Sequence, residues 1–459
     1  MGRQQQASSA GADGPRAFTW EEVEKSVPIK GNATTVSTDP VYTVINEKVY
    51  DLSGDFFSWH PGGGVAFSQL GKDATGAFDV FHPPETKEIL ANFYVGDLKE
   101  SDRGRDSGSF AEDVHELRKI IDKSGWYKSS KLWYARTVAQ TFALWGAGIY
   151  LMAKHGDNLW AVLASGALIA LFWQQCGWLS HDSCHNQLFT SRLHNDVFGY
   201  VLGNMAQGFS ISWWKHKHCT HHSVPNVHSG DPDIDTLPFL AWSEHALEGF
   251  ADLSDTGLAK FFVSYQPILY FPLLSVARLN WAISSLSWNA HDMRKHGKVF
   301  PTRSAVELAT LAVHWVWWIG AGVYFLKPAY AAIWFATSQM ICGVLLAAVF
   351  SVNHNGMPVY TKAEANGINF YELAILTGRD VHLSTFNNWF TGGLNMQIEH
   401  HMFPNVPRHN LPYLTEHVKR ICAKNGVPYH ETSLMTGISE VVGRLAVVSK
   451  GARSKVHVQ

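Results

Sequence analysis

Four long apolar segments limit the possible folds of this chain more than any other feature of its sequence. They occupy residues 132–152, 159–179, 305–326 and 329–352. Each is close to the ~20 residues that a helix needs to cross the hydrocarbon core of a membrane. Within each pair the connection is so short that the two segments must form a helical hairpin. The pattern predicts an all-α integral membrane domain with four transmembrane helices.

The apolar segments account for only part of the chain. Mean hydropathy over all 459 residues is −0.08, too low for a chain made of membrane spans alone. The formal net charge is −2, so no excess of basic residues indicates a nucleic-acid partner. The five cysteines are scattered and form no C-x-x-C pair, which favours reduced thiols over a disulfide framework.

Polar segments lie outside the predicted domains. Residues 1–17 lack the apolar core of a signal peptide, so we expect a disordered tail on the cytosolic side. Residues 99–130 read as a linker with an amphipathic helix, and residues 443–459 as a cytosolic tail. The acidic tract 231–235 is expected to be a loop beside the functional site, and 261–284, which contains two prolines, an embedded or surface helix.

Residues 18–98 have the pattern of a small soluble α+β domain. Thr19 with Glu22 three residues later is a capping box, and two β-branched runs joined by Asn46-Glu47 predict a hairpin. His60 precedes Pro-Gly-Gly, and His82 follows on a later segment. Glycines let the backbone approach a flat ligand, and two opposing histidines can bind one iron from both faces; a plain turn is the alternative explanation.

Histidines also recur in three clusters that follow apolar segments. The first pair, His181 and His185, is four residues apart, so both side chains lie on one face of a helix. The second and third clusters have related spacing and consist of His218, His221, His222, Gln397, His400 and His401. Imidazole suits iron, zinc and copper, and clusters from distant parts of a chain commonly bind more than one ion. A single histidine is more often structural, but three such clusters indicate a metal site.

The amino-terminal segment resembles cytochrome b5, whose His-Pro-Gly-Gly histidine and a second downstream histidine are the axial heme ligands. The resemblance implies a heme b bound by His60 and His82. Because both axial positions would then be filled, the implied role is electron transfer and not oxygen activation.

The order of a cytochrome b5-like domain, H-x3-H, H-x2-HH and Q-x2-HH resembles the front-end fatty acyl desaturases. The resemblance covers roughly residues 18–442, and Gln397 at the head of the third cluster is the mark of that family. It implies a di-iron center and insertion of a cis double bond between an existing double bond and the carboxyl end of an acyl chain. Residues 389–395 look most like delta-6 desaturases, whereas Met396 stands where a tyrosine is common in that group.

The same resemblance implies the fold, location and partners. The fold is a soluble α+β cytochrome b5-like domain at 18–98 followed by an all-α membrane desaturase domain at 131–442, with four transmembrane helices. The implied location is the endoplasmic reticulum membrane, with heme domain and active site cytosolic. The partners would be membrane lipid, an acyl lipid or acyl-CoA substrate, O2, and electrons from NADH through cytochrome b5 reductase.

The three clusters contain seven histidines, fewer than two six-coordinate ions require. Gln397 is one further ligand candidate, directly or through a water. His354 is the other, because it follows the last apolar segment at the depth where the clusters should meet; a helix C-terminal histidine capped by Gly356 is the structural alternative. His216 and His382 are expected near the site or on the surface.

Three other functions share some of these features. A sphingolipid delta-8 desaturase has the same clusters, and a membrane fatty acid hydroxylase has related ones. A membrane-anchored electron carrier with a degenerate second half would lack cluster histidines, and none is missing here.

Overall fold

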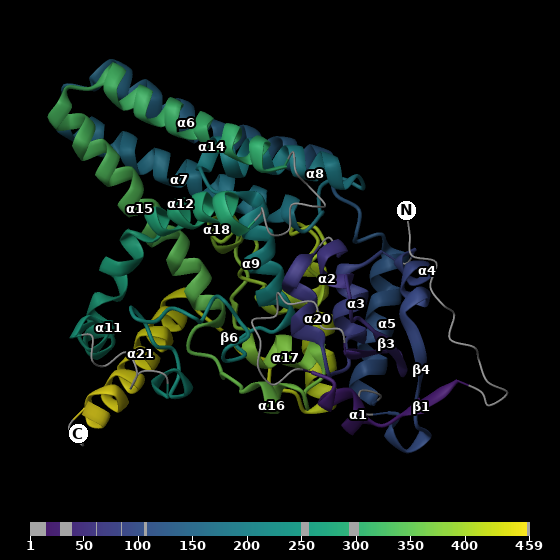
Figure 1. The fold of residues 1–459 in the computed structure, drawn as a ribbon. Helices are drawn as coiled ribbons and strands as arrows, with labels where there is room; N and C mark the ends of the chain where they lie inside the picture. Colours follow the sequence, from purple (N-terminus) through teal and green to yellow (C-terminus); the bar gives the residue numbers. More distant parts are fainter. Residues whose placement is uncertain are drawn as a thin grey trace.

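The chain forms an amino-terminal lobe, residues 15–104, and a larger helical lobe, residues 108–456 (Figure 1). The computed structural model describes residues 15–27, 39–60, 62–83, 85–104, 108–248, 257–292 and 303–456. Most of the tail predicted at 1–17 lies outside these residues.

The amino-terminal lobe is an α+β domain, as predicted. Its sheet has the strand order β1-β4-β3-β2, with β1 at Arg16–Phe18, β2 at Tyr42–Ile45, β3 at Lys48–Asp51 and β4 at Tyr94–Leu98. The predicted hairpin is confirmed: Asn46 and Glu47 connect β2 to β3 with φ of 50° and 63°. Positive φ at both positions gives the turn twist that matches twisted strands.

Short helices complete this lobe. They are α1 (Trp20–Lys25), α2 (Phe56–Trp59), the 3-10 helix η1 (Gly63–Gln69), α3 (Thr75–Phe81), α4 (Thr86–Leu90), η2 (Ala91–Phe93) and η3 (Glu100–Asp102). The capping box is confirmed at the start of α1, where the Thr19 side chain accepts from the Glu22 backbone and Glu22 accepts from the Thr19 backbone. His60 and His82 directly follow α2 and α3.

The helical lobe contains the predicted apolar helices and a set of shorter elements. The elements are α5 (Ser109–Ser124), α6 (Lys131–His155), α7 (Leu159–Cys184), α8 (Arg192–Gly199), the π-helix η4 (Tyr200–Gln207), α9 (Ile211–Ser223), η5 (His245–Leu247), α11 (Gly257–Ser275), α12 (Ala277–Ser287), η6 (Trp288–Asp292), α14 (Arg303–Phe325), α15 (Pro328–His354), α16 (Lys362–Ala365), α17 (Phe370–Thr377), β5 (Asp380–Val381), α18 (Thr385–Phe390), α19 (Gln397–Met402), α20 (Pro412–Asn425), β6 (Glu431–Thr432) and α21 (Leu434–Val456).

The prediction of four transmembrane helices needs correction. Among the described residues, three helices are long and apolar enough to cross a membrane: α7, α14 and α15. The helix over the first apolar segment, α6, has 25 residues, and its length of ~37 Å would suffice. The composition of α6 is not apolar enough for a span, because Arg136, Gln140 and several hydroxyl and aromatic side chains lower its mean hydropathy.

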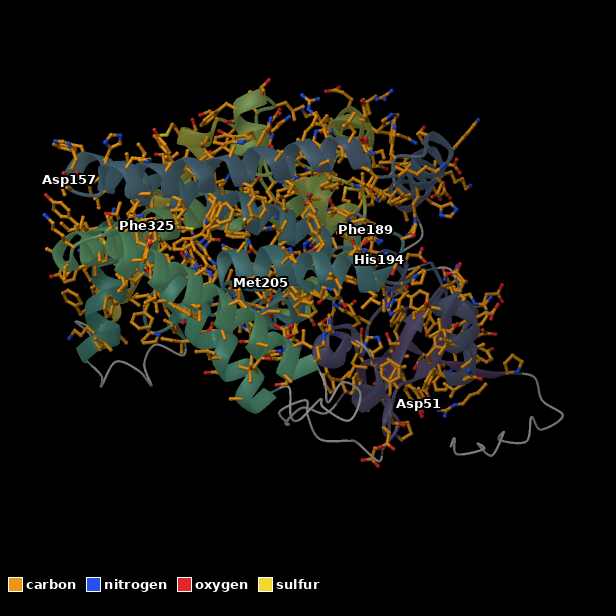
Figure 2. The ribbon with its side chains drawn as sticks, turned by 90° about the horizontal axis from the view of Figure 1, so that it is seen from above. Asp51, Asp157, Phe189, His194, Met205 and Phe325 are labelled. Atoms are coloured by element: carbon orange, nitrogen blue, oxygen red, sulfur yellow. The ribbon has the colours of Figure 1, made fainter. Side chains whose placement is uncertain are left out.

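Both predicted hairpins are present. Helix α6 packs along α7, and α14 along part of α15. The two hairpin turns lie at the same end of the molecule, where Asp157 and Phe325 mark them in Figure 2, and Phe189 and His194 lie towards the other end. The turns also touch: a Cβ on Gly156 would lie 2.9 Å from the Leu326 side chain.

Large apolar side chains on these helices face outward. Along α14, Val316, Val323 and Tyr324 are 73%, 67% and 82% exposed. The segment 261–284 does not qualify as a span, as predicted, but it forms two helices, α11 and α12, and not one; α11 contains Pro267 and Pro272. So much apolar exposure along long helices is characteristic of a membrane protein.

The ends of α7 and α15 position the candidate site. The two helices pack closely and both run from the hairpin-turn end of the molecule toward the first cluster and His354. On the far side of the site, α5, α17, α19 and α20 share a hydrophobic core that includes Ile121, Ile398 and Leu414. The five cysteines are all unpaired.

Candidate metal centre

Every histidine of the three predicted clusters lies in one buried region. His181 and His185 stand at the end of α7, the second cluster on α9 and the third on α19. His354 ends α15 and joins them. These side chains form two groups within which the potential ligand atoms lie no more than 4.8 Å apart.

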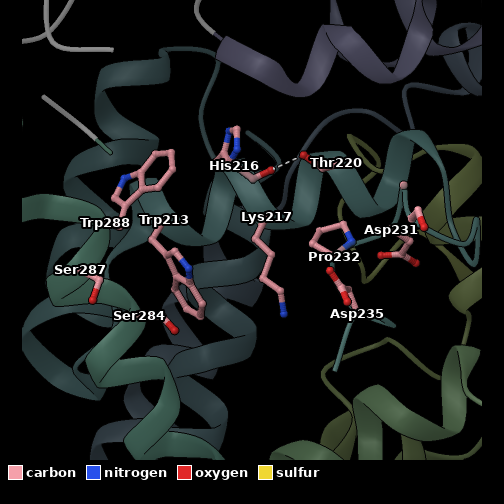
Figure 3. A pocket seen from close by; sticks show the side chains of 12 residues that line it. Trp213, His216, Lys217, Thr220, Asp231, Pro232, Asp235, Ser284, Ser287 and Trp288 are labelled. Carbon is pink, nitrogen blue, oxygen red and sulfur yellow. Dashed lines mark hydrogen bonds between the residues drawn. The ribbon is translucent and has the colours of Figure 1, made fainter. Parts of the chain in front are cut away.

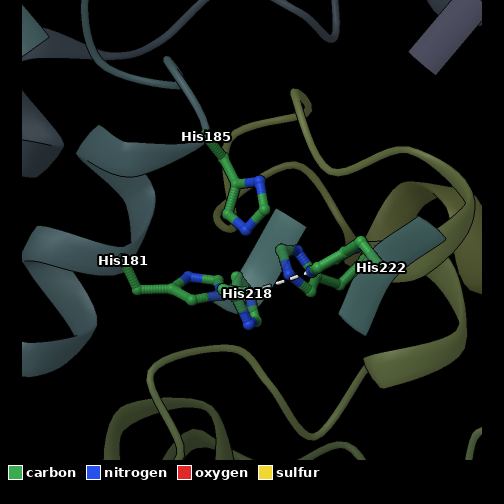
Figure 4. A group of neighbouring side chains, drawn as sticks. His181, His185, His218 and His222 are labelled. Atoms are coloured by element: carbon green, nitrogen blue, oxygen red, sulfur yellow. Dashed lines mark hydrogen bonds between the residues drawn. The ribbon is translucent and has the colours of Figure 1, made fainter. Parts of the chain in front are cut away.

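The five-histidine group consists of His181, His185, His218, His222 and His400. Nε2 of His218 lies 3.1 Å from Nε2 of His181 and 2.9 Å from Nε2 of His222 (Figure 4). Metal–nitrogen bonds of ~2.1 Å at right angles place two ligand nitrogens ~3 Å apart, so this spacing fits two ligands of one ion. Several ring nitrogens here have no hydrogen-bond partner among the described residues, including both of His400.

The three-histidine group consists of His221, His354 and His401. Nε2 of His354 and Nε2 of His401 are 3.0 Å apart. Nδ1 of His354 lies 2.9 Å from the Thr377 carbonyl, to which it donates. The prediction that His354 lies at the depth of the clusters agrees with this position. The helix ends at His354 with Asn355 as its cap, and Gly356, with φ of +90°, lies in the turn beyond, so the predicted capping role of Gly356 is wrong.

The surroundings favour neutral imidazoles in the five-histidine group. Burial, and then the charge of neighbouring histidines, lowers the pKa of His218, His222 and His400 well below the usual value. Neutral imidazole is the form that binds a metal ion, because its lone pair is free.

His221 has different surroundings. Its Nδ1 lies 2.8 Å from Asp231 Oδ2 and 3.7 Å from Asp233 Oδ2. Burial lowers the pKa of His221, but the two carboxylates raise it more, so the net direction is upward. A carboxylate on Nδ1 fixes the ring orientation and leaves Nε2 to face the other two histidines.

Gln397 lies beside the three-histidine group. Its amide nitrogen is 2.8 Å from Nε2 of His354, and its amide oxygen accepts from Nδ2 of Asn353 at 2.9 Å. The side chain therefore contacts a member of the group and is held by a second buried amide.

Some residues that support the site were missed in the sequence. Asp231 belongs to the tract that we predicted as a loop beside the site, and its spacing of ten residues from His221 was the available signal. Arg408 forms a buried ion pair of 2.8 Å with Asp182, which lies next to His181. The Tyr429 hydroxyl lies within hydrogen-bond distance of two buried carboxyl groups, 2.5 Å from Asp380 Oδ2 and 2.9 Å from Oε1 of Glu399, which is next to His400. No spacing rule links these distant positions.

The two remaining predicted histidines lie outside both groups. His382 has a side chain that is 58% exposed and lies 3.7 Å from Glu431. His216 stacks on Trp288 at the wall of a cavity of about 480 Å³ (Figure 3). Lys217 and Asp231 line the same cavity, so it adjoins the carboxylate that holds His221.

His60 and His82 face each other in the amino-terminal lobe. Their ring centroids are 5.8 Å apart. Phe56 stacks on His60 at 5.1 Å, and Phe78 stacks on His82 at 4.6 Å. Nδ1 of His82 donates to the Phe78 carbonyl at 3.1 Å, which leaves Nε2 unprotonated, and burial lowers the pKa of this ring. Two imidazoles flanked by aromatic rings fit the two axial positions of a heme.

Comparison with known proteins agrees with this geometry. Residues 158–433 match the family model described as fatty acid desaturase. The chain belongs to the fatty acid desaturase family. Residues 19–99 match the cytochrome b5-like heme/steroid binding domain, so the chain has the domain order of the front-end desaturases, which are oxidoreductases.

Individual relatives cover nearly the whole chain. It is 36% identical to the acyl-lipid (9-3)-desaturase of Physcomitrium patens over 95% of this chain and 80% of the relative. It is 32% identical to a delta(6)-fatty-acid desaturase of Caenorhabditis elegans, over 82% and 89%. It is 30% identical to the delta(8)-fatty-acid desaturase of Euglena gracilis, over 89% and 95%. The relatives thus carry different positional names.

Proposed function

We propose that this desaturase holds two iron ions, one in the five-histidine group and one in the three-histidine group. The observation that carries the proposal is the convergence of eight buried histidines with nitrogens ~3 Å apart. Gln397 would complete the second position directly or through a water. Iron bound there supplies the oxidant that takes hydrogen from an unactivated methylene.

The proposed reaction inserts a cis double bond between an existing double bond and the carboxyl end of a polyunsaturated acyl chain. One CH2–CH2 unit, O2, two electrons and two protons give one CH=CH unit and two waters. The electrons come from NADH through cytochrome b5 reductase and the amino-terminal lobe. The residues' task is to hold the ions in a dry, buried region, and the apolar surroundings of α7 and α15 suit that task.

The amino-terminal lobe would bind heme b through His60 and His82. Its fusion to the metal lobe raises the effective concentration of the electron carrier. His60→Ala should abolish the heme absorbance and leave iron in place; a full heme content in this variant would contradict the ligand assignment.

We place the enzyme in the endoplasmic reticulum membrane, with the domain boundaries predicted from the sequence and with α7, α14 and α15 as its apolar spans. Helix α6 lies along α7, so if α7 crosses the membrane, α6 occupies the same depth. The two hairpin turns, near Asp157 and Phe325 in Figure 2, then lie on the lumenal side. The cluster histidines, which gather at the opposite ends of α7 and α15, lie on the cytosolic side. A glycosylation tag at either terminus should stay unmodified; its modification would refute this orientation.

Delta-6 is our assignment for the double-bond position. It rests on residues 389–395 and on the similarity to the Caenorhabditis elegans enzyme named above. Expression in a yeast without polyunsaturated acids, with defined fatty acids supplied, tests it by product analysis. A delta-6 product supports the assignment. A double bond at another position, an unsaturated sphingoid base or a hydroxylated acid would each replace it. Tracking the product in the acyl-CoA and phospholipid fractions over time identifies the acyl carrier.

A further inference from the structure

The amino-terminal lobe contacts the helical lobe through two helices, one that follows His60 and one that precedes His82. Helix η1, which comes soon after His60, packs on α9. Helix α3, which ends just before His82, packs on α17. At that second contact a Cβ on Gly76 would lie 2.8 Å from the Phe370 side chain, so the two surfaces meet closely. An element next to each of the facing histidines, His60 and His82, is therefore in contact with the helical lobe.

The contact between η1 and α9 includes Ser223, which is one residue beyond the proposed iron ligand His222. Nε2 of Gln69 donates to the Ser223 carbonyl at 3.0 Å, and Oγ of Ser68 lies 2.8 Å from Oγ of Ser223. Ser223 directly follows His222 and is the last residue of α9. Carbonyls at a helix end have no partner within the helix, so Gln69 satisfies one of them.

Helix α3 also forms a hydrogen bond with a segment close to another proposed ligand, His401. Nδ2 of Asn405 donates to the Val80 carbonyl at 2.8 Å. Val80 is two residues before His82, and Asn405 is four residues after His401. Beside this bond, Arg118 of α5 donates to the Asp79 carbonyl at 2.6 Å and pairs with its carboxylate at 3.2 Å. Each of these hydrogen bonds therefore joins a segment next to His60 or His82 to a segment that holds a proposed metal ligand.

We propose that this docked arrangement is the state in which electrons cross from the heme to the metal centre, and that Gln69 and Asn405 are the residues that position it. Each crossing oxidises the heme iron by one electron and reduces the metal centre by one, and two crossings serve one double bond. The inference rests on the proposed function, since it assumes that His60 and His82 hold heme and that the two histidine groups hold iron. It adds the route and the residues that hold it.

A cross-link tests whether this contact exists and supports transfer. The hydroxyls of Ser68 and Ser223 are close enough that Ser68→Cys with Ser223→Cys can form a disulfide. We expect it to form on mild oxidation of the full chain before iron loading, whereas neither single variant should form it. A short bis-alkylating reagent then gives a link that survives reduction by dithionite.

The linked, heme-reduced and iron-loaded enzyme should reoxidise its heme at least as fast as the wild type when substrate and O2 are added. A slowing of tenfold or more, or failure of the disulfide to form, would overturn the proposal. Wild-type protein that makes no double bond would instead refute the proposed function, so the two failures are distinguishable.

A double variant tests the two positioning residues. Gln69→Leu with Asn405→Ala should slow both disulfide formation in the cysteine pair and heme reoxidation about tenfold, while reduction of the heme by the reductase is unchanged. Asn92 is the position of the matched control, because its side-chain amide donates to the Ile89 carbonyl within the amino-terminal lobe. Asn92→Leu should leave all three rates unchanged. Equal rates in the double variant and the wild type would show that these hydrogen bonds do not position the lobe.

Discussion

The five-histidine and three-histidine groups use the same side chain in different surroundings. In the larger group the five potential donors are all imidazoles, and several of their ring nitrogens have no hydrogen-bond partner among the described residues. In the smaller group His221 is held by Asp231 and His354 by a backbone carbonyl, and Gln397 lies alongside. The larger group offers five imidazole donors to one ion, whereas the smaller group offers three and depends more on the orientation of each donor.

The comparison predicts unequal sensitivity to the loss of one ligand. His354→Ala removes one of three donors, so we expect iron per heme to fall from about two to about one and desaturation to fall at least a hundredfold. Heme content and membrane insertion should be unchanged. A role at the helix dipole alone would cost at most ~2 kcal/mol and leave iron in place. His382→Ala is the control, since that histidine is exposed. Iron analysis of the purified variants decides between the roles.

His185→Ala tests the opposite side of the comparison. Four donors remain in the five-histidine group, so iron per heme should stay near two while desaturation falls about tenfold. The measurement is again metal analysis beside a single-substrate assay. An iron loss as large as that of His354→Ala would contradict this expectation, because it would mean that the two groups depend equally on each ligand.

Asp231→Asn addresses orientation without removing a ligand. The variant keeps the size of the side chain but loses the charge that holds Nδ1 of His221. Outer partners of metal ligands typically contribute ~10-fold to ~100-fold in metal affinity, and we expect a loss in that range, confined to one of the two irons. A chelator titration that resolves two classes of iron measures it. Asp235→Asn, in the same loop, serves as the matched control. Equal loss of both irons would show that Asp231 supports the loop as a whole.

The smallest effect is expected at Gln397. Gln397→Leu removes the amide beside His354 but no histidine, so both irons should remain and desaturation should fall only several-fold. Gln397→Glu, which keeps an oxygen, should recover most of the rate. Loss of one iron in the leucine variant would make the glutamine a necessary ligand.

Local features of this protein were predictable because neighbours along the chain determine them. The capping box at Thr19, the hairpin turn at Asn46-Glu47 and the two helical hairpins follow from short-range backbone preferences and from apolar length. The gathering of the clusters was also predictable, because the two helical hairpins return the chain to the same side each time. The number of spans was not predicted correctly, because the length of the first apolar segment was weighed more heavily than the polar side chains of α6.

Tertiary structure decided how the ligands divide. His221 and His222 are adjacent in sequence yet belong to different groups, and so do His400 and His401. Side chains of successive helix residues point ~100° apart, so a helix that lies between two sites can provide a ligand to each of them. Which site each ring meets depends on the packing of α7, α9, α15 and α19 against one another. The partnership of Asp231 with His221 and the docking of Gln69 on Ser223 have the same origin, because contacts between distant segments form only when the whole chain folds.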